Sequence, residues 1–246
     1  MKSCAKLTML FTEVPFLERF GAARAAGFKA VEVLFPYDVA VPDMLHMLAR
    51  NDLPLALINC PPPNYTGGER GFAAVAGARF RQDFKRSLRY AKALGAQHLH
   101  IMAGVAEGAE ARACFVENLR WAAAEAPQQS LTIEPINQDD MPGYFLSDFD
   151  EACAIIKEVD AANLRLQFDA YHAQKITGDV LGTWEKVADL VVHVQVGQAP
   201  GRTAPDQGEI DYRRFFARLK ADRYKGWISG EYLPAGRTEK SLDWIK

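Results

Sequence analysis

The chain has 246 residues, of which 49% are hydrophobic and 24% charged, with a net charge of −2 and a pI near 6.2. This composition suits one globular domain and excludes the basic surface that binding to nucleic acid or to an anionic membrane would favour. No apolar run reaches the length of a membrane span, and the N-terminal apolar stretch is too short for a signal peptide. The four cysteines are scattered, without a C-x-x-C pair, so we expect reduced thiols in a cytoplasmic protein.

Strand and helix signals alternate along the chain. The first strand is predicted over residues 5–11, and Pro15 opens a helix that Gly27 ends. The later strands are predicted over residues 30–35, 53–60, 97–104, 129–134, 164–169, 190–196 and 227–231. The later helices are predicted over residues 42–51, 77–94, 108–125, 147–159, 179–187, 212–221 and from about 237 onward. Eight strand–helix units in this order predict a (β/α)8 TIM barrel, an α/β fold formed by one domain over residues 1–246.

One long loop interrupts this pattern. Residues 61–71, with the sequence PPPNYTGGERG, are rich in proline and glycine. Loops of this length in compact barrels serve either as active-site covers or as solvated excursions, and the sequence leaves both interpretations open.

Four strands in the second half of the chain end in an oxygen-bearing side chain. They are about 26 to 36 residues apart and carry Glu134, Asp169, Gln195 and Glu231. Because the carboxyl ends of barrel strands meet on one face, we expect these four side chains to converge there. Three carboxylates and one amide oxygen suit Mg²⁺ or Mn²⁺, so the sequence predicts one divalent cation.

Each of these residues also has a structural interpretation. Glu134 and Glu231 are candidates for ordinary salt bridges, and Asp169 is a candidate N-cap for the helix after its strand. A strand-end amide such as Gln195 often bonds only to a loop. The metal interpretation depends on all four residues occupying equivalent barrel positions.

Further polar residues are predicted near the strand ends. The candidates for substrate binding are His172, Lys175, Arg70, Asn59 and Glu32. Arg202, on the loop after the seventh strand, is a further cation that could hold an anionic substrate, although most loop cations are simply solvated.

The other histidines are ambiguous. His193 precedes Gln195 by two residues, so it faces the same side one layer deeper, as a core histidine or as a partner of the site. His98 and His100 form an H-x-H pattern that favours core or mouth-lining contacts, and His46 is predicted to be structural.

Several segments together resemble the hydroxypyruvate isomerase family of xylose-isomerase-like TIM barrels. They are TMLFTEVPFLERFGAARAAGF, AVEVLFPYD, LPLALINC, HIMAGV, FDAYHAQK, HVQVGQAPGR and DQGEIDY, and the likeness extends from about Lys6 to Trp244. The family often has an aromatic residue after the Gly-Glu of the long loop, where this chain has Arg70.

The resemblance implies an isomerase that interconverts hydroxypyruvate and 2-hydroxy-3-oxopropanoate, or 2-oxo-tetronate in close relatives. It also implies that Glu134, Asp169, Gln195 and Glu231 bind the divalent metal, and that Glu134 and Glu231 are the proton donor and acceptor. The expected partner is a small 2-oxo or 2-hydroxy acid, and association into a homo-oligomer remains open.

Other functions remain in competition at this point. A ketose 3-epimerase uses two strand-end glutamates and one metal, but usually has a histidine where this chain has Gln195. A hydride-shift aldose isomerase typically needs two metals, and a three-metal AP endonuclease needs more histidines and a basic groove. A barrel without catalytic activity would not be expected to keep the whole ligand set.

Overall fold

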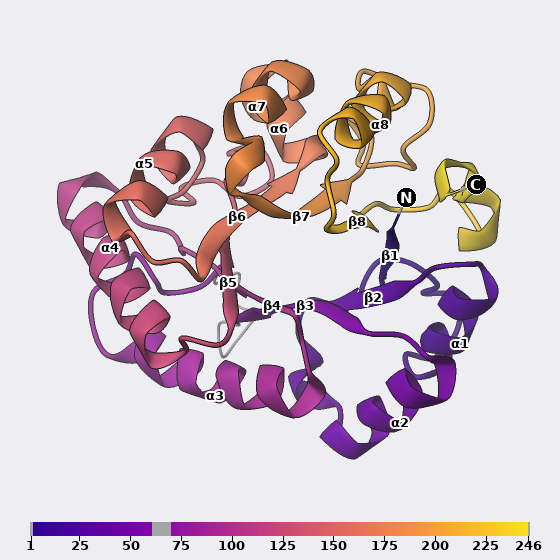
Figure 1. Ribbon diagram of the computed structural model, residues 1–246, viewed down its shortest axis with the longest axis horizontal. Coiled ribbons are helices and arrows are strands. Elements are labelled where there is room, and N and C mark those ends of the chain that lie inside the picture. The colour runs from indigo at the N-terminus through magenta and orange to yellow at the C-terminus, as the bar shows by residue number, and fades with distance from the viewer. Residues whose placement is uncertain (1, 61–69, 246) are drawn as a thin grey trace.

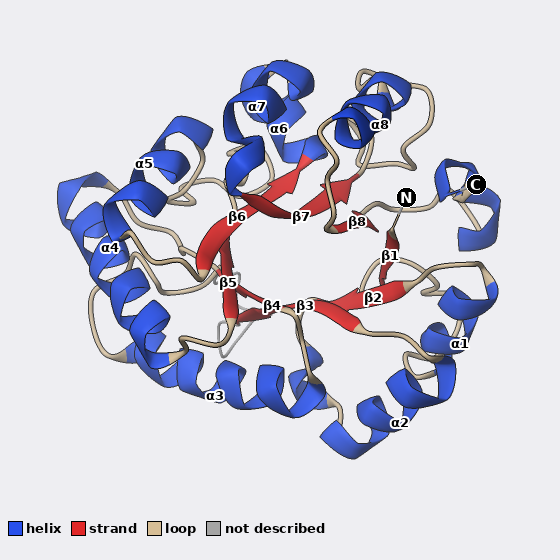
Figure 2. Ribbon diagram, viewed as in Figure 1, coloured by secondary structure: helices blue, strands red, loops and turns tan. Residues whose placement is uncertain are grey.

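The computed structural model describes residues 2–60 and 70–245 of the chain. Eight parallel strands form a closed barrel in the order β1 to β8, and helices surround it (Figures 1 and 2). The predicted (β/α)8 TIM barrel is therefore confirmed. The strands are β1 (Ser3–Lys6), β2 (Ala30–Val33), β3 (Leu55–Cys60), β4 (His98–Ile101), β5 (Ser130–Ile133), β6 (Leu164–Asp169), β7 (Val191–Val196) and β8 (Trp227–Gly230).

The helices lie on the outside of the barrel, mainly between successive strands. They are α1 (Glu18–Ala25), α2 (Val41–Asn51), α3 (Arg79–Leu94), α4 (Gly108–Glu125), α5 (Phe149–Val159), α6 (Ala170–Thr177), α7 (Val180–Val187) and α8 (Tyr212–Ala221). Among the residues described, no helix is long and apolar enough to cross a membrane.

The main hydrophobic core lies between the barrel strands and the helices. Its large side chains include Phe168, Trp184 and Phe215, whose rings contact one another with centroids 5.4 to 5.8 Å apart. The strands are almost entirely buried, and in β4, β6 and β7 apolar residues alternate with polar ones. A separate buried cluster of small residues, Cys4 and Ala30 among them, lies against Trp227.

The first strand ends earlier than its sequence suggests. β1 stops at Lys6 instead of extending to residue 11, because the Lys6 carbonyl accepts hydrogen bonds from the Met9 and Leu10 amides at 3.0 and 2.8 Å. These bonds turn the chain out of the sheet. The shift places Lys6, and not a more distant residue, at the carboxyl end of β1.

Two helix predictions need correction. The helix α6 begins directly after β6 and precedes the predicted helix at α7, so this connection contains two helices. The predicted helix after residue 237 is wrong, because that segment forms two 3-10 turns, Thr238–Ser241 and Asp243–Ile245. Thr238 binds this segment to the β1–α1 connection, where its hydroxyl accepts from the Phe11 amide at 2.7 Å.

Two glycines hold the segment after residue 70 against β4. Gly71 forms an antiparallel bridge with Ala103, and a Cβ on Gly104 would lie 2.3 Å from the Gly71 carbonyl oxygen. Both glycines have positive φ, which favours glycine over other residues. The loop at residues 61–71, which the sequence leaves open as a cover or a solvated excursion, lies outside the described residues except for positions 70 and 71.

We expect Gly104→Ala to lower the free energy of unfolding by about 3 kcal/mol, from backbone strain plus a steric overlap. Gly95→Ala is the matched control, because Gly95 also has positive φ but has open space around it. The control should lose only about 1 kcal/mol. Urea unfolding measures both values, and equal losses would contradict the close packing of Gly71 on Gly104.

Candidate active site

The carboxyl ends of β5, β6, β7 and β8 carry the four predicted oxygen ligands. Glu134 and Glu231 directly follow β5 and β8, while Asp169 ends β6 and Gln195 is the penultimate residue of β7. All four are buried, with relative exposures of 0 to 6%. Neighbouring strands therefore bring these side chains to one end of the barrel, as the sequence predicts.

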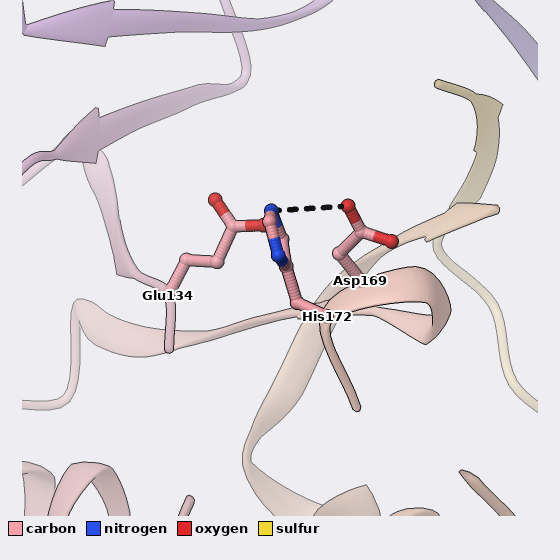
Figure 3. Close-up of side chains that lie close together, drawn as sticks. All are labelled: Glu134, Asp169 and His172. Carbon is pink, nitrogen blue, oxygen red and sulfur yellow. Dashed lines mark ion pairs between the residues drawn. The ribbon is translucent and has the colours of Figure 1, made fainter. Parts of the chain in front are cut away.

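Glu134, Asp169 and His172 form the closest cluster of this site. Each offers one ligand atom, and the three atoms lie within 4.8 Å of one another (Figure 3). The His172 Nε2 atom lies 3.6 Å from Asp169 Oδ2. His172, predicted near the mouth for substrate binding, thus joins the predicted metal ligands.

Asp169 has a structural function and a site function at once. Its Oδ1 atom accepts a hydrogen bond from the Tyr171 amide at 2.8 Å and caps the N-terminus of α6. Its Oδ2 atom faces the mouth. The N-cap interpretation and the ligand interpretation of Asp169 are therefore compatible, because each uses a different oxygen.

Arg202 reaches into the mouth from the β7–α8 loop. One of its nitrogens, Nη2, donates to Asp169 Oδ2 at 2.9 Å and to Glu231 Oε1 at 2.5 Å. The guanidinium also lies over the Tyr171 ring, 4.9 Å from the centroid. A loop cation therefore holds the outer oxygens of two strand-end carboxylates together.

Gln167 connects two of the predicted ligands from one layer deeper in the barrel. Its amide nitrogen donates to Glu134 Oε2 at 2.9 Å and to Gln195 Oε1 at 2.7 Å. The amide nitrogen of Gln195 donates in turn to Glu32 Oε1 at 2.9 Å. Gln167 precedes Asp169 by two residues on β6, so its side chain points to the same side of the strand, although nothing in the local sequence marks it as a site residue.

Lys6 is the second residue that sequence reasoning missed. Its ammonium contacts Glu231 Oε2 and lies 3.6 Å from Glu32 Oε1. Glu32 is fully buried beneath the mouth, and its Oε2 atom is 2.6 Å from His193 Nε2. The structure thus places Glu32, predicted for substrate binding, among other side chains, and makes His193 a partner of the site through Glu32.

The other predicted substrate contacts are spread more widely. The Lys175 ammonium forms an ion pair with Asp139 at 2.6 Å. Asn59 is buried and its Oδ1 lies 3.2 Å from His100 Nδ1. Arg70 is the first described residue after the gap at 61–69, and its substrate contact stays a prediction.

His98 and His46 lie away from the cluster. His98 Nδ1 is 2.9 Å from the Ser130 hydroxyl, and His46 is exposed on α2. His100 is closer, with its Nε2 atom 3.7 Å from Glu134 Oε2. Burial lowers the pKa of both His98 and His100 to about 3, so both rings are neutral at ordinary pH.

Burial disfavours ionisation of the carboxylates in this site. Desolvation raises the pKa of Glu134 well above its ordinary value, with Glu231 and Asp169 adding to the shift. Desolvation likewise raises the pKa of Asp169 to about 6, against the opposing effect of Arg202. Because burial is the main cause of both shifts, a bound cation would favour the ionised forms of these carboxylates.

The buried site contains more carboxylates than cations. Four buried carboxylates, those of Glu32, Glu134, Asp169 and Glu231, face the cations of Lys6 and Arg202 among the described residues. When all four are ionised, the carboxylates outnumber these two cations, even though His193 also contacts Glu32. The buried Oε1 atom of Glu134 has no hydrogen-bond partner in the part of the chain described. One divalent cation fits both the charge and the oxygen donors.

A closed parallel barrel with a buried cluster of acidic ligands at the strand carboxyl ends defines a TIM-barrel enzyme with a site suited to a metal ion. A family model described as xylose isomerase-like TIM barrel matches residues 20–246, and the chain belongs to this family.

Curated relatives cover nearly the whole chain. A 2-oxo-tetronate isomerase from Cupriavidus necator is 44% identical over 98% of this chain and 96% of the relative. A hydroxypyruvate isomerase from Escherichia coli is 37% identical over 100% of this chain and 98% of the relative. The protein is accordingly an enzyme of the isomerase class.

Solved structures agree with the fold. A crystal structure from Brucella melitensis, described as an AP endonuclease of family 2, has a TM-score of 0.95 at 41% identity and covers 100% of this chain and 98% of its own. A 3-keto-D-glucoside 4-epimerase from Escherichia coli has a TM-score of 0.80 at 18% identity over 100% of this chain and 98% of its own, which supports the fold alone.

We expect the protein to bind one Mn²⁺ per chain, and Asp169→Asn to weaken this binding on the order of 100-fold. Asparagine keeps the N-cap of α6 but removes the charge, so the fold should persist. Mn²⁺ binding is measured by electron paramagnetic resonance. Asp148→Asn is the matched control, because Asp148 caps α5 at the surface. Equal binding by both variants would show that Asp169 is no ligand.

His98 should make the protein less stable in mild acid. Its pKa in the folded state is about 3, whereas the unfolded chain takes up the proton near pH 6.5. The stabilising contribution of the neutral His98 ring is therefore fully present above pH 6.5 and decreases as the pH falls. Between pH 6 and pH 5, His98 should account for about 1 kcal/mol of lost unfolding free energy. Urea titrations of the wild type and His98→Gln at both pH values measure it, and identical pH slopes would contradict the burial of the neutral ring.

Proposed function

We propose that this protein is a divalent-metal-dependent isomerase that interconverts hydroxypyruvate and 2-hydroxy-3-oxopropanoate. The observation that carries the proposal is the pair of buried glutamates, Glu134 and Glu231, beside an acidic cluster that could hold one cation. The full-length relatives named for this chemistry support the same assignment.

The reaction moves one proton between adjacent carbons through an enediolate. A proton leaves C3 of hydroxypyruvate and a proton arrives at C2, while the hydroxyl proton passes from O3 to O2. The difficult step is the formation of the carbanion. A bound divalent cation, Mg²⁺ or Mn²⁺, supplies positive charge that stabilises the developing oxyanion.

The residues that would hold this cation are Glu134, Asp169, Gln195 and Glu231, with His172 beside them. Asp169 and Gln195 lie on β6 and β7, and Glu134 directly follows β5, so the barrel fixes their backbone positions. Gln195 has a second lone pair on its oxygen in addition to the one that accepts from Gln167.

Glu134 and Glu231 are the groups that would carry the proton. One removes it from C3 and the other delivers one to C2, and the two exchange these functions in the reverse direction. Arg202 contacts both Asp169 and Glu231 at the mouth, so its guanidinium is well placed to receive the carboxylate of a 2-oxo acid.

The four cysteines of the chain are free thiols, two of them buried. This agrees with a reducing compartment, and we propose a cytoplasmic location for an enzyme of this kind.

A second substrate deserves equal testing because the relative at 44% identity is named a 2-oxo-tetronate isomerase. This substrate has one more carbon and would use the same proton transfer. DNA cleavage, which the Brucella structure's description names, is a weaker assignment for this chain, because its net charge of −2 does not favour binding to phosphates.

The test is proton NMR in D₂O with hydroxypyruvate and with 2-oxo-tetronate, each with and without Mn²⁺ or Mg²⁺. We expect isomerisation that depends on the metal and places deuterium at the reacting carbon. Glu134→Gln should reduce kcat at least about 1,000-fold, because the proton-carrying group is lost. Asp148→Asn, at the surface cap of α5, should leave kcat unchanged.

The faster substrate identifies the physiological class. Turnover without metal would contradict the proposed cofactor, and normal turnover by Glu134→Gln would contradict the proposed proton carrier. If the protein turned over neither acid, the proposed function would be wrong.

A further inference from the structure

Lys6 is a charged residue in the interior of the barrel. It ends β1, and it points to the same side as Cys4, which belongs to the buried cluster inside the barrel. In the sheet, Lys6 is paired with Glu32 on β2, and β8 is the other neighbour of β1. The side chain therefore lies between the strand that carries Glu32 and the strand that leads to Glu231.

A contribution to the stability of the fold does not explain why the Lys6 ammonium is buried. The Lys6 side chain is 2% exposed, and the side chains of Glu32 and Glu231 are 0% and 8% exposed. Buried ion pairs of this kind are often replaced by apolar residues without loss of stability, because the desolvation cost is large. A lysine at this position is therefore expected to serve the site.

The two oxygens of Glu231 have different partners. Oε2 contacts Lys6 from inside the barrel, whereas Oε1 accepts from Arg202 at the mouth. Arg202 is 19% exposed and belongs to a loop, while Lys6 belongs to a strand. Lys6 is therefore the more rigid of the two contacts, and it leaves Oε1 as the oxygen that faces the mouth.

Glu134 is held in a parallel way. Its Oε2 atom accepts from Gln167, and its Oε1 atom has no hydrogen-bond partner among the described residues. Each glutamate thus has one oxygen anchored from beneath. The anchors differ, because Glu134 is held by a neutral amide and Glu231 by a cation.

We propose that Lys6 is a positioning residue of the isomerase, which holds the inner oxygen of Glu231 so that the outer oxygen faces the substrate. This inference rests on the proposed function and adds a residue to it. We expect Lys6 to make no contact with the substrate, because its side chain is almost fully buried and contacts Glu231 and Glu32.

The test replaces Lys6 with methionine, which keeps the length of the side chain and removes the charge. We expect kcat with saturating Mn²⁺ to fall about 100-fold, because a misplaced carboxylate transfers the proton poorly. KM should change less than about threefold, since Lys6 makes no substrate contact. Lys2→Met is the matched control, because Lys2 is exposed and lies on the same segment of chain.

A second readout does not depend on turnover. Without the nearby positive charge, Glu231 should attract a divalent cation more strongly, so Mn²⁺ binding by the substrate-free Lys6→Met protein should tighten about tenfold. Lower kcat together with tighter Mn²⁺ binding would support a positioning function. Loss of both together would overturn it, because general damage to the site weakens both.

The double variant Lys6→Met/Glu32→Gln covers the case in which the single variant does not fold. It removes a carboxylate together with the ammonium, so the net buried charge is the same as in the wild type. We expect its kcat to remain low. Recovery to within about threefold of wild type would overturn the proposal, because Lys6 would then serve only to neutralise Glu32.

The outcomes also separate this proposal from the proposed function. An active wild type with an equally active Lys6→Met variant would overturn the positioning function alone. A wild type that isomerises neither acid would overturn the proposed function and, with it, the function of Lys6 in that reaction.

Discussion

A continuous chain of polar contacts beneath the mouth determines how the site is arranged. It runs from Glu231 to Lys6 and Glu32, and from Glu32 through Gln195 and Gln167 to Glu134. It connects the two glutamates without passing through the mouth itself. Because these side chains come from six of the eight strand positions, the geometry of the site depends on closure of the barrel.

This arrangement separates what holds the site from what reacts in it. The inner oxygens of Glu134 and Glu231 are occupied by Gln167 and Lys6, while the outer oxygens are open to the mouth or to Arg202. A polar network in a low-dielectric interior is favourable only when its members are satisfied. The Oε1 atom of Glu134, which has no hydrogen-bond partner among the described residues, is an exception, and it lies where a cation would bind.

The sequence predicted that Glu134, Asp169, Gln195 and Glu231 converge, because position along a parallel strand determines which end of the barrel a residue reaches. Asp169 and Gln195 lie at the ends of strands whose apolar runs are unambiguous. Lys6 was missed because the apolar residues after it suggested a longer first strand, whereas the Lys6 carbonyl turns the chain. Pattern alone does not show a hydrogen bond that ends a strand.

Other parts of the site depend on contacts between distant segments. Nothing local distinguishes Gln167 from any strand glutamine, and Arg202 resembles a solvated loop arginine until β7 and α6 bring it to Asp169. Glu32 was expected at the mouth, but its pairing with His193 keeps it beneath. These contacts join residues more than 25 positions apart in the sequence. They follow from the closure and the register of the barrel, and a sequence pattern provides neither.

The position of Arg202 has a thermodynamic consequence for any metal at the mouth. Arg202 already contacts Asp169 and Glu231, so a divalent cation held by these carboxylates would compete with the guanidinium for them. Its net binding free energy is therefore the gain at the carboxylates minus the loss of two ion pairs and of the stacking on Tyr171. The guanidinium would therefore weaken the binding of a metal ion here and speed its exchange. Such an ion would be a readily exchanged activator and not a permanent part of the folded protein.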